Sequence, residues 1–187
     1  KITPISLEND TPLIPEMYML GSSNGGVQFA IEEGLGFVFA GHISPQLAIP
    51  MLRKYHDEFK PSKYNDKPKG IFSTIVITAE TDEEAAYLAG PVELNWVRMH
   101  TGNLHLPFPT AEEAAQHVYS SQEIAIRERN KDRFIIGSIE NVAKRIREIT
   151  ASAMVDEVMI MEFYPDKQSS DKAYHLLAKE FNLKIQE

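Results

Sequence analysis

The chain has 187 residues, 43% of them hydrophobic, which is enough to bury one sizeable core. Its formal net charge of −8, with Lys and Arg scattered along the chain, argues against binding to nucleic acid or to an anionic membrane surface. The absence of cysteine excludes disulfides, thiolate metal sites and a Cys nucleophile. No apolar run approaches the roughly 20 residues of a membrane span, so we expect a cytoplasmic protein. Because the chain begins at Lys1, we expect it to have lost residues or to be part of a longer protein.

The first half of the chain alternates apolar runs with helical patterns. Residues 1–15 contain three prolines and are predicted to form an entering loop, followed by one α/β domain over residues 16–187. We expect a strand at 16–20 and a helix from near Val27 that ends at Gly34. Residues 37–40 predict a strand buried on both faces. A helix begins at Ser44 and Pro45 and reaches about Phe59, and residues 71–78 form the next strand.

The second half continues the alternation. A capping box at residues 81–84 starts a helix to about Met99, bent at Gly90 and Pro91. Residues 101–109 form a loop, and a second capping box at Thr110 starts one helix to about Arg129. A short extended piece at 134–136, a helix after Ser138, a last strand at 157–163 and a helix at 169–181 complete the chain. This order predicts a parallel sheet with right-handed crossovers, whose ligands bind at the C-terminal ends of the strands.

Six small residues separate the first strand from the first helix. They are Gly21, Ser22, Ser23, Asn24, Gly25 and Gly26. Glycines allow a tight turn, the serine hydroxyls add donors, and the following helix directs its N–H groups and its positive dipole end at an anion. The spacing matches neither a P-loop nor a Rossmann fingerprint. The stretch therefore predicts a phosphate site, with an ordinary turn as the alternative.

Five motifs in the chain support a family resemblance. They are MYMLGSSNGG, GLGFVFAGHISP, AETDEEAAYLAG, IIGSIENVAKRIREI and DEVMIME, in this order. Together they resemble the C-terminal half of the bacterial luciferase-like flavin monooxygenases, notably the alkanal-monooxygenase-like branch. The resemblance implies a TIM (β/α)8 barrel of which only strands 5–8 and their helices are present, since a complete barrel takes about 250 residues. It also implies that reduced FMN binds with its phosphate on the turn at residues 21–26, and that O2 is the co-substrate.

The histidines supply the other candidate site residues. His42 follows a buried strand at the end of the sheet where active sites lie, so it is a weak candidate for a catalytic group or a substrate contact. The alternative is a loop histidine bonded to backbone. His100 and His105 flank the 101–109 loop, which resembles the family's mobile lid over flavin and substrate, with a solvated loop as the alternative. The remaining histidines lie in predicted helices without metal-ligand spacing, so we predict no metal.

Two groups of other residues have simple structural interpretations. Capping and the helix dipole explain the acidic residues at 82–84 and 112–113, so no carboxylate pair suggests general acid–base catalysis. Tyr87 and Trp96 are predicted to be core or interface aromatics.

These observations predict a luciferase-like flavin-dependent monooxygenase that uses reduced FMN and O2 on a small organic substrate, such as an aldehyde or alkane derivative, and is inactive as this half alone. One alternative is a non-catalytic flavin- or phosphate-binding half-barrel, and another is an unrelated α/β domain that binds a sugar phosphate. Expected partners are the small-molecule substrate and a flavin reductase, with no nucleic acid and no membrane.

A half-barrel also predicts association with another chain. Strands at 17–20 and 157–162 would be unpaired sheet edges. An inner face with Val38, Ile75, Ile77 and Val158 would be exposed. We therefore expect a homo-oligomer or association with a separate N-terminal half.

Overall fold

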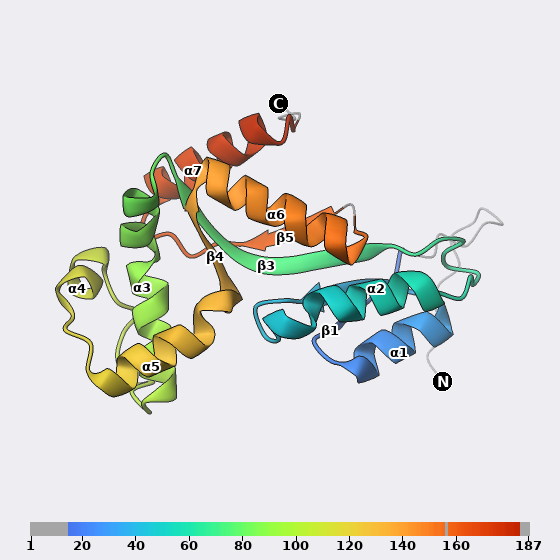
Figure 1. The fold of residues 1–187 in the computed structure, drawn as a ribbon, viewed down its shortest axis with the longest axis horizontal. Coiled ribbons are helices and arrows are strands. Elements are labelled where there is room, and N and C mark those ends of the chain that lie inside the picture. The colour runs from blue at the N-terminus through green and yellow to red at the C-terminus, as the bar shows by residue number, and fades with distance from the viewer. Residues whose placement is uncertain (1–14, 156, 184–187) are drawn as a thin grey trace, which may run out of the picture.

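The computed structural model describes residues 15–155 and 157–183. Apart from Pro15, the predicted entering loop lies outside these residues. The described chain forms an α/β structure around one parallel sheet (Figure 1). Its five strands are β1 (Tyr18–Gly21), β2 (Gly36–Ala40), β3 (Gly70–Ala79), β4 (Phe134–Ser138) and β5 (Glu157–Met161). The parallel α/β fold predicted from the sequence is therefore confirmed.

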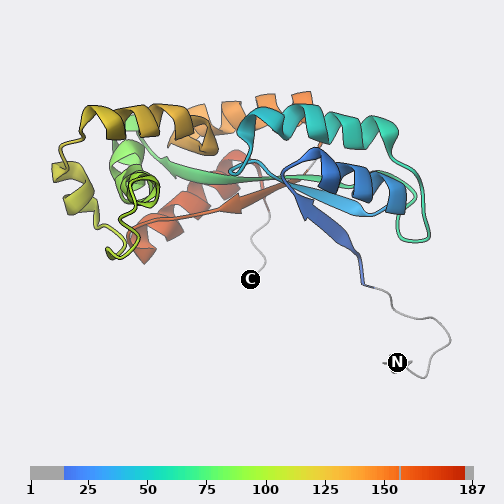
Figure 2. The same ribbon diagram turned by 90° about the horizontal axis from the view of Figure 1, so that it is seen from below.

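Strand β3 is the centre of the sheet. Its residues 71–75 pair with β5, so β2 and β4 occupy the opposite edge of β3. They follow one another along that edge, because β2 pairs with residues 70–73 and β4 with residues 75–79. Among the described residues, β1 pairs only with β2 and β5 only with β3. The sheet is thus open at both sides, as Figure 2 shows.

Seven α-helices connect and cover the strands within the described ranges. They are α1 (Asn24–Glu33), α2 (Ala48–Glu58), α3 (Asp82–His100), α4 (Ala111–Gln116), α5 (Ser121–Asn130), α6 (Ile139–Ala153) and α7 (Lys167–Glu180). Short 3-10 turns precede α2 (η1, Pro45–Leu47) and β4 (η2, Lys131–Arg133). None of the helices in these ranges has an apolar stretch long enough to cross a membrane.

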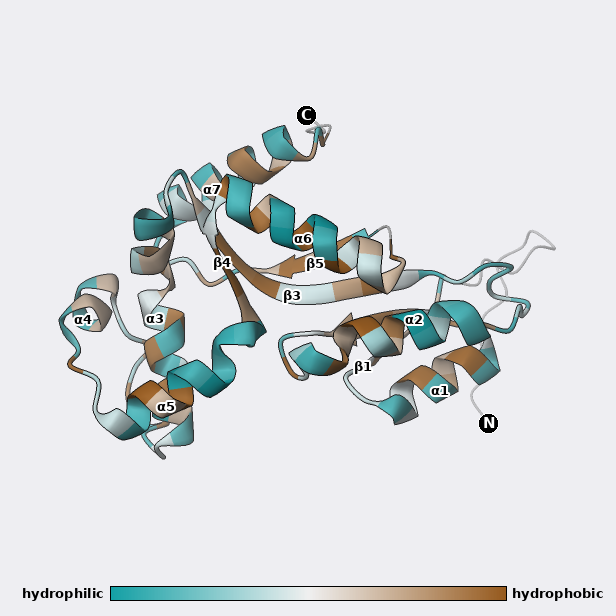
Figure 3. Cartoon of the chain, viewed as in Figure 1, coloured by the Kyte–Doolittle hydropathy of each residue, from teal (hydrophilic) through white to brown (hydrophobic). Residues whose placement is uncertain are grey.

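Two hydrophobic clusters form the core. The larger one joins α1, α2 and α6 to one face of the sheet, through side chains such as Ile31, Phe39, Leu52 and Ile146. The smaller one packs α3 against Ile75, Ile77 and Phe134. In Figure 3 most of β3 and β4 is apolar, whereas α2 and α6 alternate between apolar and polar residues, as expected for helices that cover a sheet on one side only.

The smaller cluster corrects the prediction of an exposed inner face. Val38, Ile75 and Ile77 are buried. For Ile75 and Ile77 the reason is that α3 covers the C-terminal half of β3, with Leu88, Ala89 and Val92 against them. Val158 is half-buried and packs against the larger cluster instead.

Several element boundaries also differ from the prediction. The single helix expected over residues 110–129 is two helices, α4 and α5, because the chain is extended at His117 and starts again at Ser120. Ser120 and Glu123 form a reciprocal capping box there. The last helix begins at Lys167 with Asp166 as its N-cap, and β5 ends at Met161.

Candidate functional site

The six small residues form the junction between β1 and α1. Gly21 is the last residue of β1, and α1 begins at Asn24 rather than near Val27, so Asn24, Gly25 and Gly26 are its first turn. A Cβ on Gly26 would lie 3.3 Å from the Cα of Gly21, and the reverse contact is equally short. The absence of a side chain at these two positions lets the strand end and the helix approach this closely without displacing either backbone. The sequence therefore forms a short turn that leads directly into a helix N-terminus.

The N-terminus of α1 is open. The side chain of the N-cap residue, Ser23, makes no capping hydrogen bond, and the first turn contains no acidic residue. By contrast, side chains of Thr81, Thr110, Ser120 and Asp166 accept capping bonds at α3, α4, α5 and α7. A Cβ built on Gly25 would meet only the Ser23 Oγ, at 4.0 Å. The first N–H groups of α1 are thus accessible to a ligand and lie at the positive end of the helix dipole.

A lysine not foreseen from the sequence lies at the same turn. The Lys54 ammonium, from α2, donates to Asn24 Oδ1 at 3.0 Å and to Gln28 Oε1 at 3.2 Å. Both acceptors are neutral amides, and no salt bridge involves Lys54 within residues 15–155 and 157–183. A half-buried cation beside an open helix N-terminus favours an anion. No local sequence signal could have found Lys54, because it is 30 positions from Asn24.

His42 lies at the neighbouring strand end. Because β1 and β2 are parallel and Gly21 pairs with Phe39, the turn at residues 21–26 and His42 leave the same edge of the sheet. The His42 Nδ1 is buried and has no hydrogen-bond partner among the described groups. Burial lowers the pKa of His42, the charge of Arg133 lowers it further, and the Ser73 backbone acts in the opposite direction. His42 therefore has a lowered pKa and one buried ring nitrogen without a partner among the described groups.

Arg133, from η2, fixes the backbone around His42. Its Nη1 donates to the carbonyl oxygens of His42 and Ile43, both at 2.6 Å. Its Nε donates to Asn130 Oδ1, also at 2.6 Å, and its guanidinium lies 5.4 Å from the centroid of the Trp96 ring. The half-buried Trp96 is a core aromatic as predicted, whereas Tyr87 is exposed.

The two other candidate histidines are in a different part of the molecule. His100 is the last residue of α3, and its Nδ1 lies 2.9 Å from the Trp96 carbonyl oxygen. His105 is exposed in the 101–109 loop. In Figure 2 this yellow-green loop is at the left end of the chain, whereas the blue strand β1 ends near the middle. Within the described ranges, no hydrogen bond joins either histidine to the turn at residues 21–26. Their role as lid residues stays a prediction.

The acidic residues do more than stabilise their own helices. Asp82 accepts hydrogen bonds from the Ser138 N–H at 2.6 Å and from Asn141 Nδ2 at 2.9 and 3.0 Å. The carboxylate of α3 therefore caps α6, and these bonds lower the pKa of Asp82. The interpretation of residues 82–84 as local capping alone was incomplete. No group of three metal-binding side chains occurs within the part of the chain that the structure describes.

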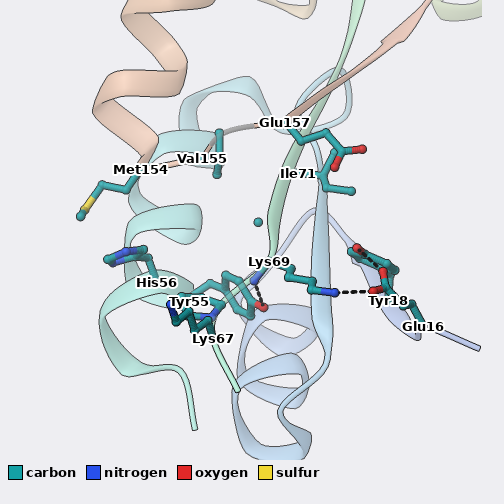
Figure 4. Close-up of a pocket in the computed structure, with 12 residues that line it drawn as sticks. Glu16, Tyr18, Tyr55, His56, Lys67, Lys69, Ile71, Met154, Val155 and Glu157 are labelled. Atoms are coloured by element: carbon teal, nitrogen blue, oxygen red, sulfur yellow. Dashed lines mark hydrogen bonds and ion pairs between the residues drawn. The ribbon is translucent and has the colours of Figure 1, made fainter. Parts of the chain in front are cut away.

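A cavity of about 570 Å³ lies away from this site, at the N-terminal ends of the strands (Figure 4). Charged side chains of both signs line it, with an ion pair of 2.5 Å between Lys69 and Glu16. None of the predicted site residues belongs to its lining. Because ligands of parallel α/β sheets bind at the opposite, C-terminal edge, we assign the candidate site to the strand ends at residues 21–26 and 42.

Comparison with known proteins agrees with the fold and the motifs. No family model matches the chain. It is 32% identical over 173 residues to the uncharacterized protein YceB of Bacillus subtilis, covering 91% of this chain and 52% of that protein. It is 24% identical over 160 residues to the luciferase-like monooxygenase of Escherichia coli K12, covering 86% of this chain and 48% of that protein. The chain is therefore similar in sequence to luciferase-like monooxygenases over about half of their length.

Solved structures show the same fold. The crystal structure of apo-MsnO8 superimposes with a TM-score of 0.82 at 23% identity, over 98% of this chain and 56% of that one. The oxygenating constituent of 3,6-diketocamphane monooxygenase from Pseudomonas putida, in complex with FMN, superimposes with a TM-score of 0.52 at 18% identity, over 92% of this chain and 50% of that one. The chain thus spans about half the length of the luciferase-like relatives that it matches.

Proposed function

We propose that this chain is the C-terminal half of a luciferase-like flavin-dependent monooxygenase barrel and binds the phosphate of reduced FMN. The observation that carries the proposal is the open N-terminus of α1, where the side chain of the N-cap residue Ser23 makes no capping hydrogen bond. The FMN-bound structural neighbour supports a flavin ligand, and the relatives named as monooxygenases support the reaction class.

The residues present fit a phosphate. The N–H groups of Asn24 and Gly25 and the hydroxyls of Ser22 and Ser23 would donate to its oxygens. The Lys54 ammonium would add a positive charge. Gly25 leaves a space that a side chain would fill, which gives a phosphate room to reach the helix amides.

The chemistry would come from the cofactor. Reduced FMN, when bound, supplies the electrons that activate O2 for attack on a small organic substrate, such as an aldehyde or alkane derivative. The residues of this chain bind and orient the flavin through the turn at 21–26. His42, at the next strand end, would offer its imidazole, with the buried and unpartnered Nδ1, to the flavin or the substrate. The loop at 101–109, with His100 and His105, would limit the access of water.

A second candidate function is flavin binding without catalysis. It is favoured by the length of the match, since the chain covers only 48% of the monooxygenase relative. We expect no oxidation of an aldehyde or alkane by the purified chain with reduced FMN and O2, even when a flavin reductase supplies the reduced FMN. Turnover by the chain alone would contradict this expectation.

The open sheet leads to a proposal about partners. β1 and β5 each have a free edge among the described strands, and the side chains of Leu20 and Met159 on them are 64% and 46% exposed. We propose that a second copy or a complementary half covers these edges. Light scattering at micromolar concentration tests this, and a stable species near the 21.1 kDa mass of the chain would contradict it.

FMN titration followed by flavin fluorescence tests the proposed function. Wild-type chain should bind FMN, inorganic phosphate should compete with it, and Lys54→Met should weaken binding by about tenfold, as expected for the loss of one charge-assisted contact. Lys144→Met is the matched control, because Lys144 is an exposed helical lysine on α6. Equal affinities of the two variants would remove Lys54 from the site. Absence of FMN binding by the wild-type chain would contradict the proposed function.

A further inference from the structure

Arg133 connects three segments of the chain at the candidate site. It reaches the loop after β2 through the His42 and Ile43 carbonyls, the end of α5 through Asn130, and α3 through the ring of Trp96. Asn130 is itself buried, and its Nδ2 donates to the Ile126 carbonyl at 2.7 Å. The Asn130 side chain is therefore fixed by its own hydrogen bond, and it holds the Arg133 guanidinium in position while the guanidinium binds the loop.

Backbone hydrogen bonds and close packing also restrict the conformation of the loop after β2. The Gly41 N–H donates to the Ser73 carbonyl at 2.7 Å, and a Cβ on Gly41 would lie 2.4 Å from the Phe72 ring. The Ile43 N–H donates to the Ala40 carbonyl at 3.0 Å. Arg133 binds two further polar groups of this turn, the carbonyls of His42 and Ile43.

We propose that Arg133 is a positioning residue, which fixes the direction of the His42 imidazole at the flavin end of the sheet by binding the His42 and Ile43 carbonyls. The proposal rests on the proposed function only for the statement that flavin binds at this end. Arginine suits this task because its planar fork donates to several acceptors at once. A lysine has one ammonium and cannot reproduce the bonds to both the loop and Asn130.

The arrangement also links the candidate lid to His42. The 101–109 loop follows α3, where Arg98 donates to the Pro107 carbonyl at 2.9 Å. Trp96, two residues earlier on the same helix, lies 5.4 Å from the Arg133 guanidinium. The 101–109 loop and the Arg133 side chain that binds the His42 backbone are therefore both in contact with α3.

The test compares Arg133→Lys, Arg133→Met and the control Arg129→Met in the full chain. Arg129 is an exposed arginine on α5, so its removal changes the net charge equally without touching the loop. The readouts are the His42 imidazole resonances, assigned with His42→Gln, and the hydrogen exchange rate of the Ile43 amide. In both Arg133 variants we expect the His42 resonances to shift and Ile43 exchange to accelerate by at least about tenfold, as for the loss of a hydrogen bond to a charged group. Arg129→Met should change neither.

Arg133→Lys keeps the charge, so it separates positioning from electrostatics. If His42 and Ile43 behave as in wild type in folded Arg133→Lys, the proposal is wrong. Equal changes at His100 and His175 would show a general loss of structure and would also contradict it. If Arg133→Met does not fold, Arg133→Lys alone decides. Neither readout needs flavin, so a wild-type chain that fails to bind FMN would overturn the proposed function and leave this test valid.

Discussion

Gly25 offers a direct test of the phosphate site, because a side chain there would enter the space in front of the α1 amides. The ideal Cβ meets only the Ser23 Oγ, at 4.0 Å, so Gly25→Val should fit without strain in the protein. Valine is also a slightly better helix former than glycine, by a few tenths of a kcal/mol. Stability should therefore stay the same or rise.

Ligand binding should change in the opposite direction. The two γ-methyl groups of valine would occupy the position from which a phosphate reaches the N–H groups of Asn24 and Gly25. We expect the FMN dissociation constant to rise by at least about tenfold, or about 1.4 kcal/mol. Gly25→Ala is the matched control, because it adds the helix propensity but only one methyl group. Its effect on affinity should be smaller.

The assay is an FMN titration by fluorescence, combined with a thermal melt of each variant. A folded Gly25→Val protein with wild-type FMN affinity would remove the turn from the flavin site. A loss of affinity accompanied by a loss of stability would instead indicate that the space around Gly25 is needed for packing.

Two further predictions concern the supports of the strand ends. Tyr164→Phe should lower the free energy of unfolding in urea by about 1–3 kcal/mol, because the buried Thr78 N–H would lose its bond of 2.8 Å to the phenol oxygen. Burial raises the pKa of Tyr164 to about 12. The protonated phenol therefore contributes its full stabilisation below pH 10, and this stabilisation is lost as the pH rises to 12. An absorbance titration in which Tyr164 has a normal pKa would contradict this. Asp82→Asn should destabilise the protein at pH 7, and because its hydrogen bonds to Ser138 and Asn141 lower the pKa of Asp82, the stabilisation by this carboxylate is present at neutral pH and is lost as the pH falls through the lowered pKa. The difference in thermal midpoint between wild type and Asp82→Asn, at pH 7 and at pH 2, measures this effect. An equal difference at both pH values would exclude the carboxylate as the cause.

The strands and most helices were predictable because their signals are local. The run at residues 37–40 is apolar throughout, which is typical of a strand buried on both faces, and β2 is buried along its whole length. Gly34 was expected to end the first helix, and it has the left-handed conformation, with φ of 60°. Thr81 caps α3 through the Glu84 N–H as its motif predicts.

The break between α4 and α5 was missed although its signal was present. Ser120 and Glu123 have the capping-box spacing, but the helical pattern before them continues without an obvious stop. Side-chain contacts around Tyr119 accompany the interruption, since the Arg127 guanidinium lies 4.4 Å from the Tyr119 ring centroid and His117 packs on the same ring. Val118 is 90% exposed, so the apolar pattern was misleading at this point.

Part of the candidate site was predictable from the sequence and part was not, because only some of its residues are identified by their local sequence. The turn at residues 21–26 and His42 follow strands, so their sequence positions alone placed them at one edge of a parallel sheet. Lys54 and Arg133 reach that edge from α2 and η2, over separations of 30 and 91 residues, and only the folded chain brings them there. Both are cations that bind neutral oxygens of the site, Asn24 and Gln28 in one case and two loop carbonyls in the other. The Lys54 charge favours an anion at the turn, and the Arg133 charge lowers the pKa of His42. Substitutions at Gly25 and Lys54 should therefore alter FMN affinity, whereas substitutions at Arg133 should alter the geometry of His42 even in the absence of FMN.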